Sequence, residues 1–458
     1  MKICVIGTGY VGLVAGTCLA EMGNDVICVD NDVQKLEQLK NGNIPIYEPG
    51  LEEMIKNNIQ AKRLSFTPNI GLAVKQSLIC FIAVGTPQEE DGSADLKYVE
   101  QVATSIAKSM NNYKIIVNKS TVPVGTGEKL RELISGLTSK KFDIVSNPEF
   151  LKQGAAVEDF LRPDRIILGV ESENAKNIML DLYSPLVRNQ NPILTMDIKS
   201  AEMVKYASNV FLAMKISYIN KIANLCENVN ADINQVRIGM SSDSRIGTKF
   251  LYPGIGFGGS CFPKDIKALI NIMDENEIDS EFISQIEKIN YEQKTRFIER
   301  ILNRFDNSIK GKTFAIWGLA FKPKTNDVRE APAINIINEL LNLGATINAY
   351  DPKAMDNART IFKDKIKYAD SYYETLENAD AVILLTEWNE FRRPDFERIK
   401  ETLKTPIIFD GRNQYNEEYL KEIGFEYYQI GRRNEENRVN GVNGINLDSK
   451  RGKVCAQD

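Results

Sequence analysis

The chain has 458 residues, 43% of them hydrophobic, and its 57 Lys and Arg against 62 Asp and Glu leave a net charge of −5. At about 150 residues per domain this length predicts roughly three domains, and the acidic balance argues against generic binding to nucleic acid or to an anionic membrane. The sequence contains no histidine. A Ser-His-Asp or Cys-His nucleophile and a His-ligated metal are therefore excluded, and proton transfer falls to carboxylates, lysine, cysteine or bound water.

The first residues have the pattern of a dinucleotide-binding unit. A short apolar strand runs into a G-x-G-x-x-G turn, a helix rich in Ala and Leu, and a second strand that ends at Asp30. Glycines in this turn let a pyrophosphate approach the helix N-terminus, while the acidic residue binds the ribose hydroxyl and repels a 2′-phosphate. We therefore expect NAD rather than NADP here; the alternative is a glycine turn without cofactor. The residues of the turn are Gly7, Gly9, Tyr10, Val11 and Gly12.

Further apolar runs at residues 78–84, 114–118 and 142–145 alternate with helical segments, which predicts a parallel sheet. Polar residues follow two of these runs, including Thr121 after one and Glu149 after another. Strand ends of this kind point into the ligand crevice of such a sheet. The same residues could equally be ordinary turn residues.

A helix is expected at residues 200–228, which contain no Gly or Pro, with Ser200 as its N-cap. Its apolar positions cover much of its circumference, so we expect a central helix buried between domains or subunits. Lys205 and Asn209 lie four residues apart on one face and could stabilise an oxyanion. A role in packing alone is about as probable from the spacing.

The most unusual segment reads Pro-Gly-Ile-Gly-Phe-Gly-Gly-Ser-Cys-Phe-Pro-Lys-Asp, at residues 253–265. Clustered glycines allow the backbone to approach a ligand closely. Cys261, with Lys264 and Asp265 just after it, has the surroundings of an activated thiol nucleophile. The alternative is a small apolar residue packed beneath a loop, as expected for Cys4, Cys28 and Cys80 in their strands.

After residue 310 the opening pattern returns, with an insertion at residues 321–330 where the first copy has its glycine turn. The predicted fold is α/β: two Rossmann-like doubly wound parallel-sheet domains joined by a central helical domain with a long helix. The predicted domains are residues 1–198, 199–306 and 307–431, followed by a disordered tail at 432–458. Seven scattered cysteines, no secretory signal and no membrane-length apolar run predict a cytoplasmic protein without disulfides.

These segments together make the chain resemble the UDP-glucose/GDP-mannose dehydrogenase family over about residues 1–430. Gly-Phe-Gly-Gly-Ser-Cys-Phe-Pro-Lys-Asp is the most specific of the shared motifs. The others are at residues 7–12, 45–51, 119–123, 147–151, 205–209 and 321–330. The resemblance implies oxidation of the C6 alcohol of a nucleotide sugar to a carboxylate with two NAD and one water. UDP-glucose is the favoured substrate, with GDP-mannose and a UDP-N-acetylhexosamine as alternatives.

The resemblance also implies roles for individual residues. Thr121, Lys205 and Asp265 would surround the water or base that removes the alcohol proton, and Cys261 would form a thiohemiacetal and then a thioester. Lys205 and Asn209 would stabilise the oxyanions. Glu149 would assist hydrolysis, because Gln153 stands where many relatives carry a glutamate.

Contacts with ligands follow from the same resemblance. Around NAD it implies Lys35, Thr86, Thr121, Lys264 and Arg329 beside the glycine turn and Asp30. Around the nucleotide sugar it implies Phe150, Leu151, Lys205, Asn209, Phe250, Tyr252, Gly258, Phe321, Lys322 and Arg412, with Arg245 coming from a neighbouring subunit of a homodimer. No metal, nucleic acid or membrane is implied.

Two other readings of the residues stay open. A 2-hydroxyacid-type dehydrogenase also pairs a lysine with an asparagine four residues on, and it would transfer one hydride without a thiol. A protein that senses NAD or a nucleotide sugar without turnover would keep the binding residues alone.

Overall fold

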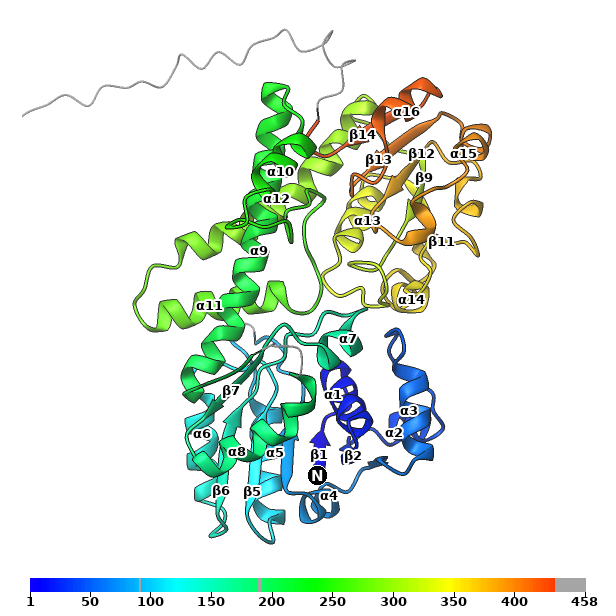
Figure 1. Ribbon diagram of the computed structural model, residues 1–458. Coiled ribbons are helices and arrows are strands. Elements are labelled where there is room, and N and C mark those ends of the chain that lie inside the picture. Colours follow the sequence, from blue (N-terminus) through cyan, green and yellow to red (C-terminus); the bar gives the residue numbers. More distant parts are fainter. Residues whose placement is uncertain (90–91, 188–191, 433–458) are drawn as a thin grey trace, which may run out of the picture.

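A computed structural model describes residues 1–89, 92–187 and 192–432. Two α/β domains lie at opposite ends of the molecule, and a group of helices joins them along one side (Figure 1). The helical middle lies between the two domains in the sequence, as the return of the opening pattern after residue 310 predicted. The domain boundaries that the sequence predicts after residues 198 and 306 stay predictions.

The first domain is built on an eight-stranded sheet of order β3-β2-β1-β4-β5-β6-β7-β8. Alternate residues of β1 belong to two apolar cores, one on each face, because Ile3 and Val5 pack in one and Cys4 and Ile6 in the other. The strands are β1 (Lys2–Ile6), β2 (Asp25–Val29), β3 (Leu64–Thr67), β4 (Ile79–Ile82), β5 (Lys114–Asn118), β6 (Phe142–Ser146), β7 (Ile166–Val170) and β8 (Ile193–Met196). The helices are α1 (Tyr10–Glu21), α2 (Val33–Lys40), α3 (Leu51–Gln60), α4 (Ile70–Gln76), α5 (Lys97–Ser109), α6 (Thr126–Ser135), α7 (Ala156–Leu161) and α8 (Glu173–Tyr183).

The first six strands of this sheet are parallel, but β7 runs antiparallel to β6, with Val145 opposite Val170. The sheet is therefore not parallel throughout. The connection from β6 to β7 contains only the short helix α7, and the chain turns back at the carboxyl edge instead of crossing to the other edge. β8 then pairs in parallel with β7.

The C-terminal domain repeats the first one with six parallel strands in the order β11-β10-β9-β12-β13-β14. This order corresponds strand for strand to β3-β2-β1-β4-β5-β6, which confirms the internal repeat predicted from the sequence. The strands are β9 (Thr313–Trp317), β10 (Thr346–Tyr350), β11 (Lys367–Tyr368), β12 (Ala381–Leu384), β13 (Ile407–Asp410) and β14 (Glu426–Gln429). The helices are α13 (Pro332–Asn342), α14 (Met355–Phe362), α15 (Phe396–Thr402) and α16 (Glu417–Glu422).

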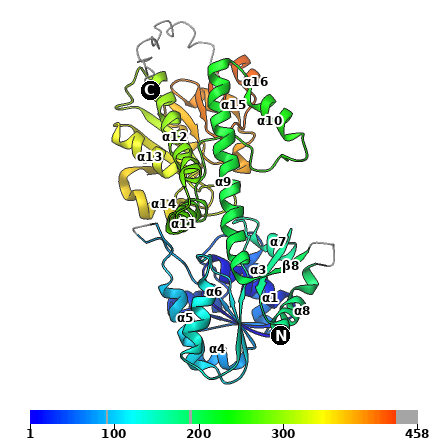
Figure 2. The same cartoon turned by 90° about the vertical axis from the view of Figure 1, so that its left-hand side faces the viewer.

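The helical middle consists of α9 (Ile198–Val229), α10 (Ile233–Ser241), α11 (Phe262–Glu275) and α12 (Glu281–Arg304). Its 32-residue helix α9 is about 48 Å long and runs from the first domain to the C-terminal domain (Figure 2). The prediction of Ser200 as its N-cap is wrong. Asp197 caps the helix by accepting a hydrogen bond from the Ser200 N–H at 2.8 Å, and Ile198 is already buried in the core.

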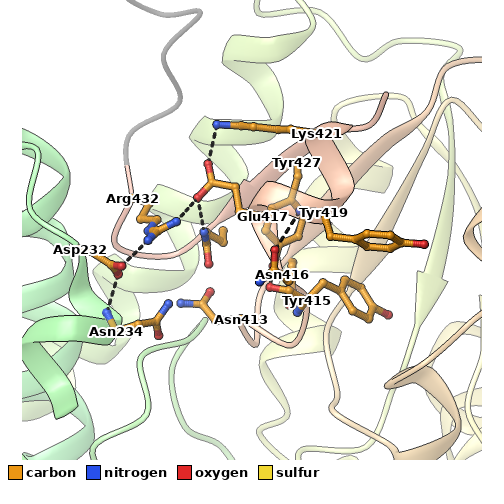
Figure 3. Close-up of polar contacts among 12 residues, drawn as sticks. Asp232, Asn234, Asn413, Tyr415, Asn416, Glu417, Tyr419, Lys421, Tyr427 and Arg432 are labelled. Atoms are coloured by element: carbon orange, nitrogen blue, oxygen red, sulfur yellow. Dashed lines mark hydrogen bonds and ion pairs between the residues drawn. The ribbon is translucent and has the colours of Figure 1, made fainter. Parts of the chain in front are cut away.

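The end of the C-terminal domain is fastened to the helical middle by Arg432 (Figure 3). Its guanidinium pairs with Asp232, the N-cap of α10, and with Glu417 of α16 at 2.6 Å. The Gly431 N–H adds a hydrogen bond to Glu227 of α9. Apart from Arg432, the tail predicted to be disordered lies outside the described residues.

Among residues 1–89, 92–187 and 192–432, no helix combines the length and the apolar character needed to cross a membrane.

Candidate active site

A cavity of about 880 Å³ lies where the two α/β domains and the helical middle meet. The first domain contributes the segment after β6, α9 contributes one face, and the C-terminal domain contributes its inserted segment. Predicted site residues that line this cavity are Glu149, Phe150, Leu151, Lys205, Asn209, Phe250, Tyr252, Gly258, Cys261, Phe321, Lys322 and Arg412. The site is thus assembled from segments far apart in the sequence.

The glycine-rich segment forms an irregular loop between α10 and α11. A Cβ at Gly258 would lie 2.1 Å from the backbone oxygen of Glu330, and a Cβ at Gly259 would lie 2.8 Å from the Phe321 ring. Gly259 also has a φ of +86°, which a side chain disfavours. These glycines let the loop lie directly against the inserted segment of the C-terminal domain.

Cys261 occupies the N-cap position of α11 and is half-buried at the edge of the cavity. Burial raises the pKa of its thiol, and the charges of Glu149 and Asp265 add to that increase. Lys205 and Lys264 act in the opposite direction without reversing it. The raised pKa favours the protonated thiol near neutral pH.

Lys205 and Glu149 form a buried ion pair at one side of the thiol. The Lys205 Nζ donates to Glu149 Oε1 at 2.8 Å and to the Glu149 backbone oxygen at 2.6 Å, and both side chains are 5–6% exposed. Burial alone would raise the pKa of Glu149, but the Lys205 charge lowers it overall. Glu149 likewise raises the pKa of Lys205 against the effect of burial. Both groups are accordingly charged.

Asp265 lies one helical turn after Cys261 in α11 and joins two of the predicted residues. Its Oδ2 accepts a hydrogen bond from Asn209 Nδ2 at 2.6 Å, and its Oδ1 pairs with Lys264 Nζ at 2.5 Å. The Asp265 N–H also donates to the Cys261 backbone oxygen at 2.8 Å. The side chain is 1% exposed, and these contacts fix its position one turn from the thiol.

Two arginines at the cavity are ordered by contacts of their own. The Arg165 guanidinium stacks on the Phe150 ring at 3.8 Å. Arg412 donates from Nε to the Leu385 backbone oxygen at 2.8 Å and pairs with Glu387 at 3.2 Å. Arg165, Phe150 and Arg412 thus give the cavity a basic and partly aromatic lining, which suits a negatively charged ligand.

The glycine turn at the start of α1 has the geometry of a cofactor site. A Cβ at Gly12 would lie 1.9 Å from the Gly7 oxygen, whereas a Cβ at Gly9 would meet nothing within 4 Å. Gly9 is the N-cap of α1 without a side-chain cap, so the first N–H groups of the helix are available to an anion. The glycine at position 9 leaves the space that a pyrophosphate needs.

Asp30 closes this site at the end of β2. It accepts hydrogen bonds from the Thr8 Oγ1 at 2.6 Å, from the Thr8 N–H at 2.9 Å and from Lys35 Nζ at 2.9 Å. Burial works against ionisation, but these donors lower the pKa of Asp30 to about 2. Nearby, Thr86 Oγ1 donates to the Thr121 backbone oxygen at 2.8 Å, which joins two of the predicted cofactor residues.

Arg245 and Arg329 are not among the residues that line the cavity, and they pair with neighbouring aspartates. Arg245 is exposed and pairs with its neighbour Asp243. Arg329 pairs with Asp327 at 2.6 Å. Gln153 lines the cavity and donates to the same Asp327 at 2.9 Å, so it links the first domain to the inserted segment.

The sequence analysis missed Lys119 and Glu387 as site residues, although both line the cavity. Burial lowers the pKa of Lys119 to about 8, and its Nζ donates to Asn147 Oδ1 at 3.1 Å. Each residue comes directly or shortly after a buried strand, Lys119 after β5 and Glu387 after β12. That position was the available signal, because such strand ends face the ligand crevice.

Comparison with known proteins covers the entire site. Models of the UDP-glucose/GDP-mannose dehydrogenase family match in chain order: the NAD binding domain at residues 1–187, the central domain at 199–292 and the UDP binding domain at 315–417. UDP-glucose 6-dehydrogenase TuaD of Bacillus subtilis is 47% identical, covering 94% of this chain and 93% of that protein. UDP-glucose 6-dehydrogenase of Pseudomonas aeruginosa is 46% identical, covering 94% and 98%.

Two solved structures share the arrangement of all three parts. The UDP-glucose dehydrogenase of Pyrobaculum islandicum superposes with a TM-score of 0.87 at 35% identity, covering 94% of this chain and 98% of that one. A UDP-D-ManNAc dehydrogenase of Pyrococcus horikoshii reaches 0.82 at 27% identity, covering 94% and 99%. The glycine turn, the cysteine loop and Arg412 therefore lie in domains that match in the same order. The chain belongs to the UDP-glucose/GDP-mannose dehydrogenase family of NAD-dependent oxidoreductases.

Proposed function

We propose that this chain oxidises UDP-glucose at C6 to UDP-glucuronate, with two NAD and one water, through a covalent bond to Cys261. The observation that carries the proposal is the position of this thiol. It lies on a glycine loop at the edge of the cavity, close to a buried lysine–glutamate pair and to a buried aspartate. A single hydride transfer would need no such thiol.

The residues around the glycine turn fit NAD. The free N-terminus of α1 would bind the pyrophosphate, and Asp30 with Lys35 would bind the adenosine ribose. Tyr10, Val11, Thr86, Thr121, Lys264 and Arg329 complete the proposed cofactor contacts. When bound, NAD accepts a hydride from the substrate in each of the two oxidations.

In the first oxidation the C6 alcohol loses a proton and a hydride and becomes an aldehyde. We assign the removal of this proton to a water or base held among Thr121, Lys205 and Asp265. Asp265 is well suited to hold such a water, because its carboxylate is already oriented by Asn209 and Lys264.

The Cys261 sulfur then adds to the aldehyde carbon. A C–S bond forms, and the proton of the thiol ends on the former carbonyl oxygen, which gives a neutral thiohemiacetal. This order of steps agrees with a thiol whose pKa is raised by burial, because the proton leaves the sulfur only as the C–S bond forms. The charge of Lys205 and the amide of Asn209 stabilise the oxygen while it carries negative charge.

Loss of a second hydride and a proton converts the thiohemiacetal to a thioester. Water then attacks the thioester carbon and the C–S bond breaks. One proton of the water ends on the sulfur and the other is released to solvent, so the products are the carboxylate and the free thiol. Glu149 is the proposed helper in this step, since Lys205 and the Leu151 N–H hold its carboxylate in an ionised state that can orient a water.

The nucleotide would be bound by the C-terminal wall of the cavity. Arg412 and Lys322 supply positive charge near the diphosphate, and the remaining proposed contacts are Phe150, Leu151, Phe250, Tyr252, Gly258 and Phe321. Arg245, exposed in one chain, would complete the site of its neighbour in a homodimer. The 47% identity to a UDP-glucose 6-dehydrogenase, against 27% to a UDP-D-ManNAc dehydrogenase, favours UDP-glucose over the same chemistry on another nucleotide sugar.

The proposal is tested by incubating the protein with NAD and a panel of nucleotide sugars: UDP-glucose, GDP-mannose and UDP-N-acetylhexosamines. We expect two NADH per UDP-glucose and loss of the overall reaction in Cys261→Ser. One NADH per sugar with an active Cys261→Ser variant would instead indicate a 2-hydroxyacid-type dehydrogenase. No turnover of any sugar would indicate a sensor.

A further inference from the structure

The loop that carries Cys261 has no regular structure, and buried side-chain amides hold its backbone. Asn220 of α9 accepts a hydrogen bond from the Gly254 N–H at 2.9 Å, and Gln293 of α12 donates to the Gly254 oxygen at 3.0 Å. Both amides are at most 1% exposed. The beginning of the loop is therefore fixed from two helices at once.

Asn290 of α12 makes the corresponding contact four residues before the thiol. Its Oδ1 accepts from the Phe257 N–H at 2.7 Å, and its Nδ2 donates to the Phe257 oxygen at 3.0 Å. One side chain thus satisfies both backbone groups of one residue, as a neighbouring strand would. Asn290 is 5% exposed, so water does not compete strongly for these bonds.

The space around this contact leaves little freedom. A Cβ at Gly256 would lie 2.6 Å from Asn290 Oδ1, and Gly256 has a φ of +101°. The amide therefore occupies the space that a side chain at position 256 would need, which holds this part of the loop in one path.

Contacts before and after Cys261 in the sequence couple its position to that of Phe257. The Phe257 ring packs edge-on against the ring of Phe262, the first residue of α11, with centroids 5.7 Å apart. In the segment between Phe257 and Phe262, the Gly259 N–H donates to the Arg329 backbone oxygen at 3.0 Å. A shift of the Phe257 backbone would therefore move the turn that holds the sulfur.

We propose that Asn290 is a positioning residue, whose amide fixes the Phe257 backbone and thereby holds the Cys261 sulfur in line with the aldehyde carbon. This inference rests on the proposed function. It predicts that Asn290 matters for the steps that use the thiol and much less for the first oxidation, which does not use it.

The test compares Asn290→Ala and Asn290→Asp with a matched control, Asn303→Ala, an exposed asparagine on the same helix. Asn290→Asp keeps the size and the acceptor for the Phe257 N–H but replaces the donor with a second acceptor. We expect Asn290→Ala to oxidise the aldehyde roughly 100-fold more slowly, the typical effect of misplacing a reacting atom by about 1 Å. The rate of the first hydride transfer should stay close to that of the wild type, so the aldehyde should accumulate. In Asn290→Asp the rate of aldehyde oxidation should lie between those of the wild type and Asn290→Ala.

A second readout needs no NAD. The nucleotide-sugar aldehyde formed in the first oxidation is added with iodoacetamide, and alkylation of the Cys261 peptide is measured by mass spectrometry. The aldehyde should protect Cys261 in the wild type and in Asn303→Ala. It should protect Cys261 less in the Asn290 variants. Equal losses in both oxidations, unchanged protection, or loss of folding in both variants would each overturn the positioning role. A Cys261→Ser variant that keeps the full reaction would instead overturn the proposed function, so the two failures are distinguishable.

Discussion

Glu202, in the second turn of α9, should reveal its protonation in the stability of the protein. Its Oε2 accepts a hydrogen bond from the Gly125 N–H at 2.7 Å and its Oε1 from the Gly127 N–H at 2.8 Å. Gly125 is the N-cap of α6, so a carboxylate of one helix caps another. The residue is only 3% exposed, which makes its ionisation costly.

Burial raises the pKa of Glu202 from its ordinary value of 4.5 to about 7. The two amides lower it in part, Glu128 adds to the increase and Lys199 reduces it. Because the folded pKa lies above the unfolded one, the folded state binds more protons between those values, and stability falls as the pH rises through this window. The loss amounts to about 3 kcal/mol above pH 7, or roughly 6–12 °C in the melting temperature of a domain of about 200 residues.

The decisive substitution is Glu202→Gln, which keeps the shape and cannot ionise. The amide nitrogen of Gln cannot accept the second of the two N–H bonds, so we expect the variant to melt below the wild type near about pH 5. The difference in melting temperature should shift in favour of the variant by roughly 6–12 °C between about pH 5 and about pH 8. Circular dichroism across this pH range measures the difference, and infrared titration of the carboxyl group that the variant lacks measures the pKa directly. Glu132→Gln is the matched control, because Glu132 is an exposed glutamate of the same helix α6 and does not contribute to the pKa shift of Glu202. A difference in melting temperature that stays the same from about pH 5 to about pH 8 would show that burial does not raise this pKa, and the reasoning would be wrong.

Three other substitutions test separate parts of the structure. Gly258→Ala forces a Cβ to within 2.1 Å of the Glu330 oxygen, so kcat/KM for the sugar should fall roughly 100-fold, while NAD binding by calorimetry stays unchanged; normal kinetics would contradict the close approach. Asp30→Ala removes the proposed ribose acceptor and should weaken the preference for NAD over NADP by roughly 10–100-fold, and an unchanged ratio of the two kcat/KM values would refute that role. Arg432→Ala breaks the contact with Glu417 and should destabilise the C-terminal domain by about 1 kcal/mol, seen as faster amide exchange in β14; equal exchange would mean that the contact adds no stability.

Much of the fold could be predicted from local pattern. β5 has the bounds predicted at residues 114–118, because it is a continuous apolar run that ends at a turn residue. The missed strand β7 is also an apolar run, but it follows an irregular stretch and pairs antiparallel, so no repeat of strand and helix pointed to it.

The candidate site was predictable in its residues and less so in its contacts. The sequence pointed to Cys261 and Lys205 because their neighbours are unusual. It did not reveal that burial raises the pKa of the thiol, or that Gln153 binds Asp327. Such effects depend on which distant segments pack together, and spacing along the chain carries no information about them. The shifted N-cap of α9 has a simpler cause, since Asp197 and Ser200 are both good capping residues.

The hydrogen bonds between the cysteine loop and the C-terminal domain have a consequence for substrate selection. The Ile255 N–H donates to the oxygen of Gly411, which directly precedes Arg412. The C-terminal residue proposed to bind the diphosphate is thus linked through the backbone to the loop that carries Cys261. Under the proposed function, binding energy from the nucleotide would lower the barrier at the distant C6 carbon, so a sugar without its nucleotide would lose turnover as well as affinity.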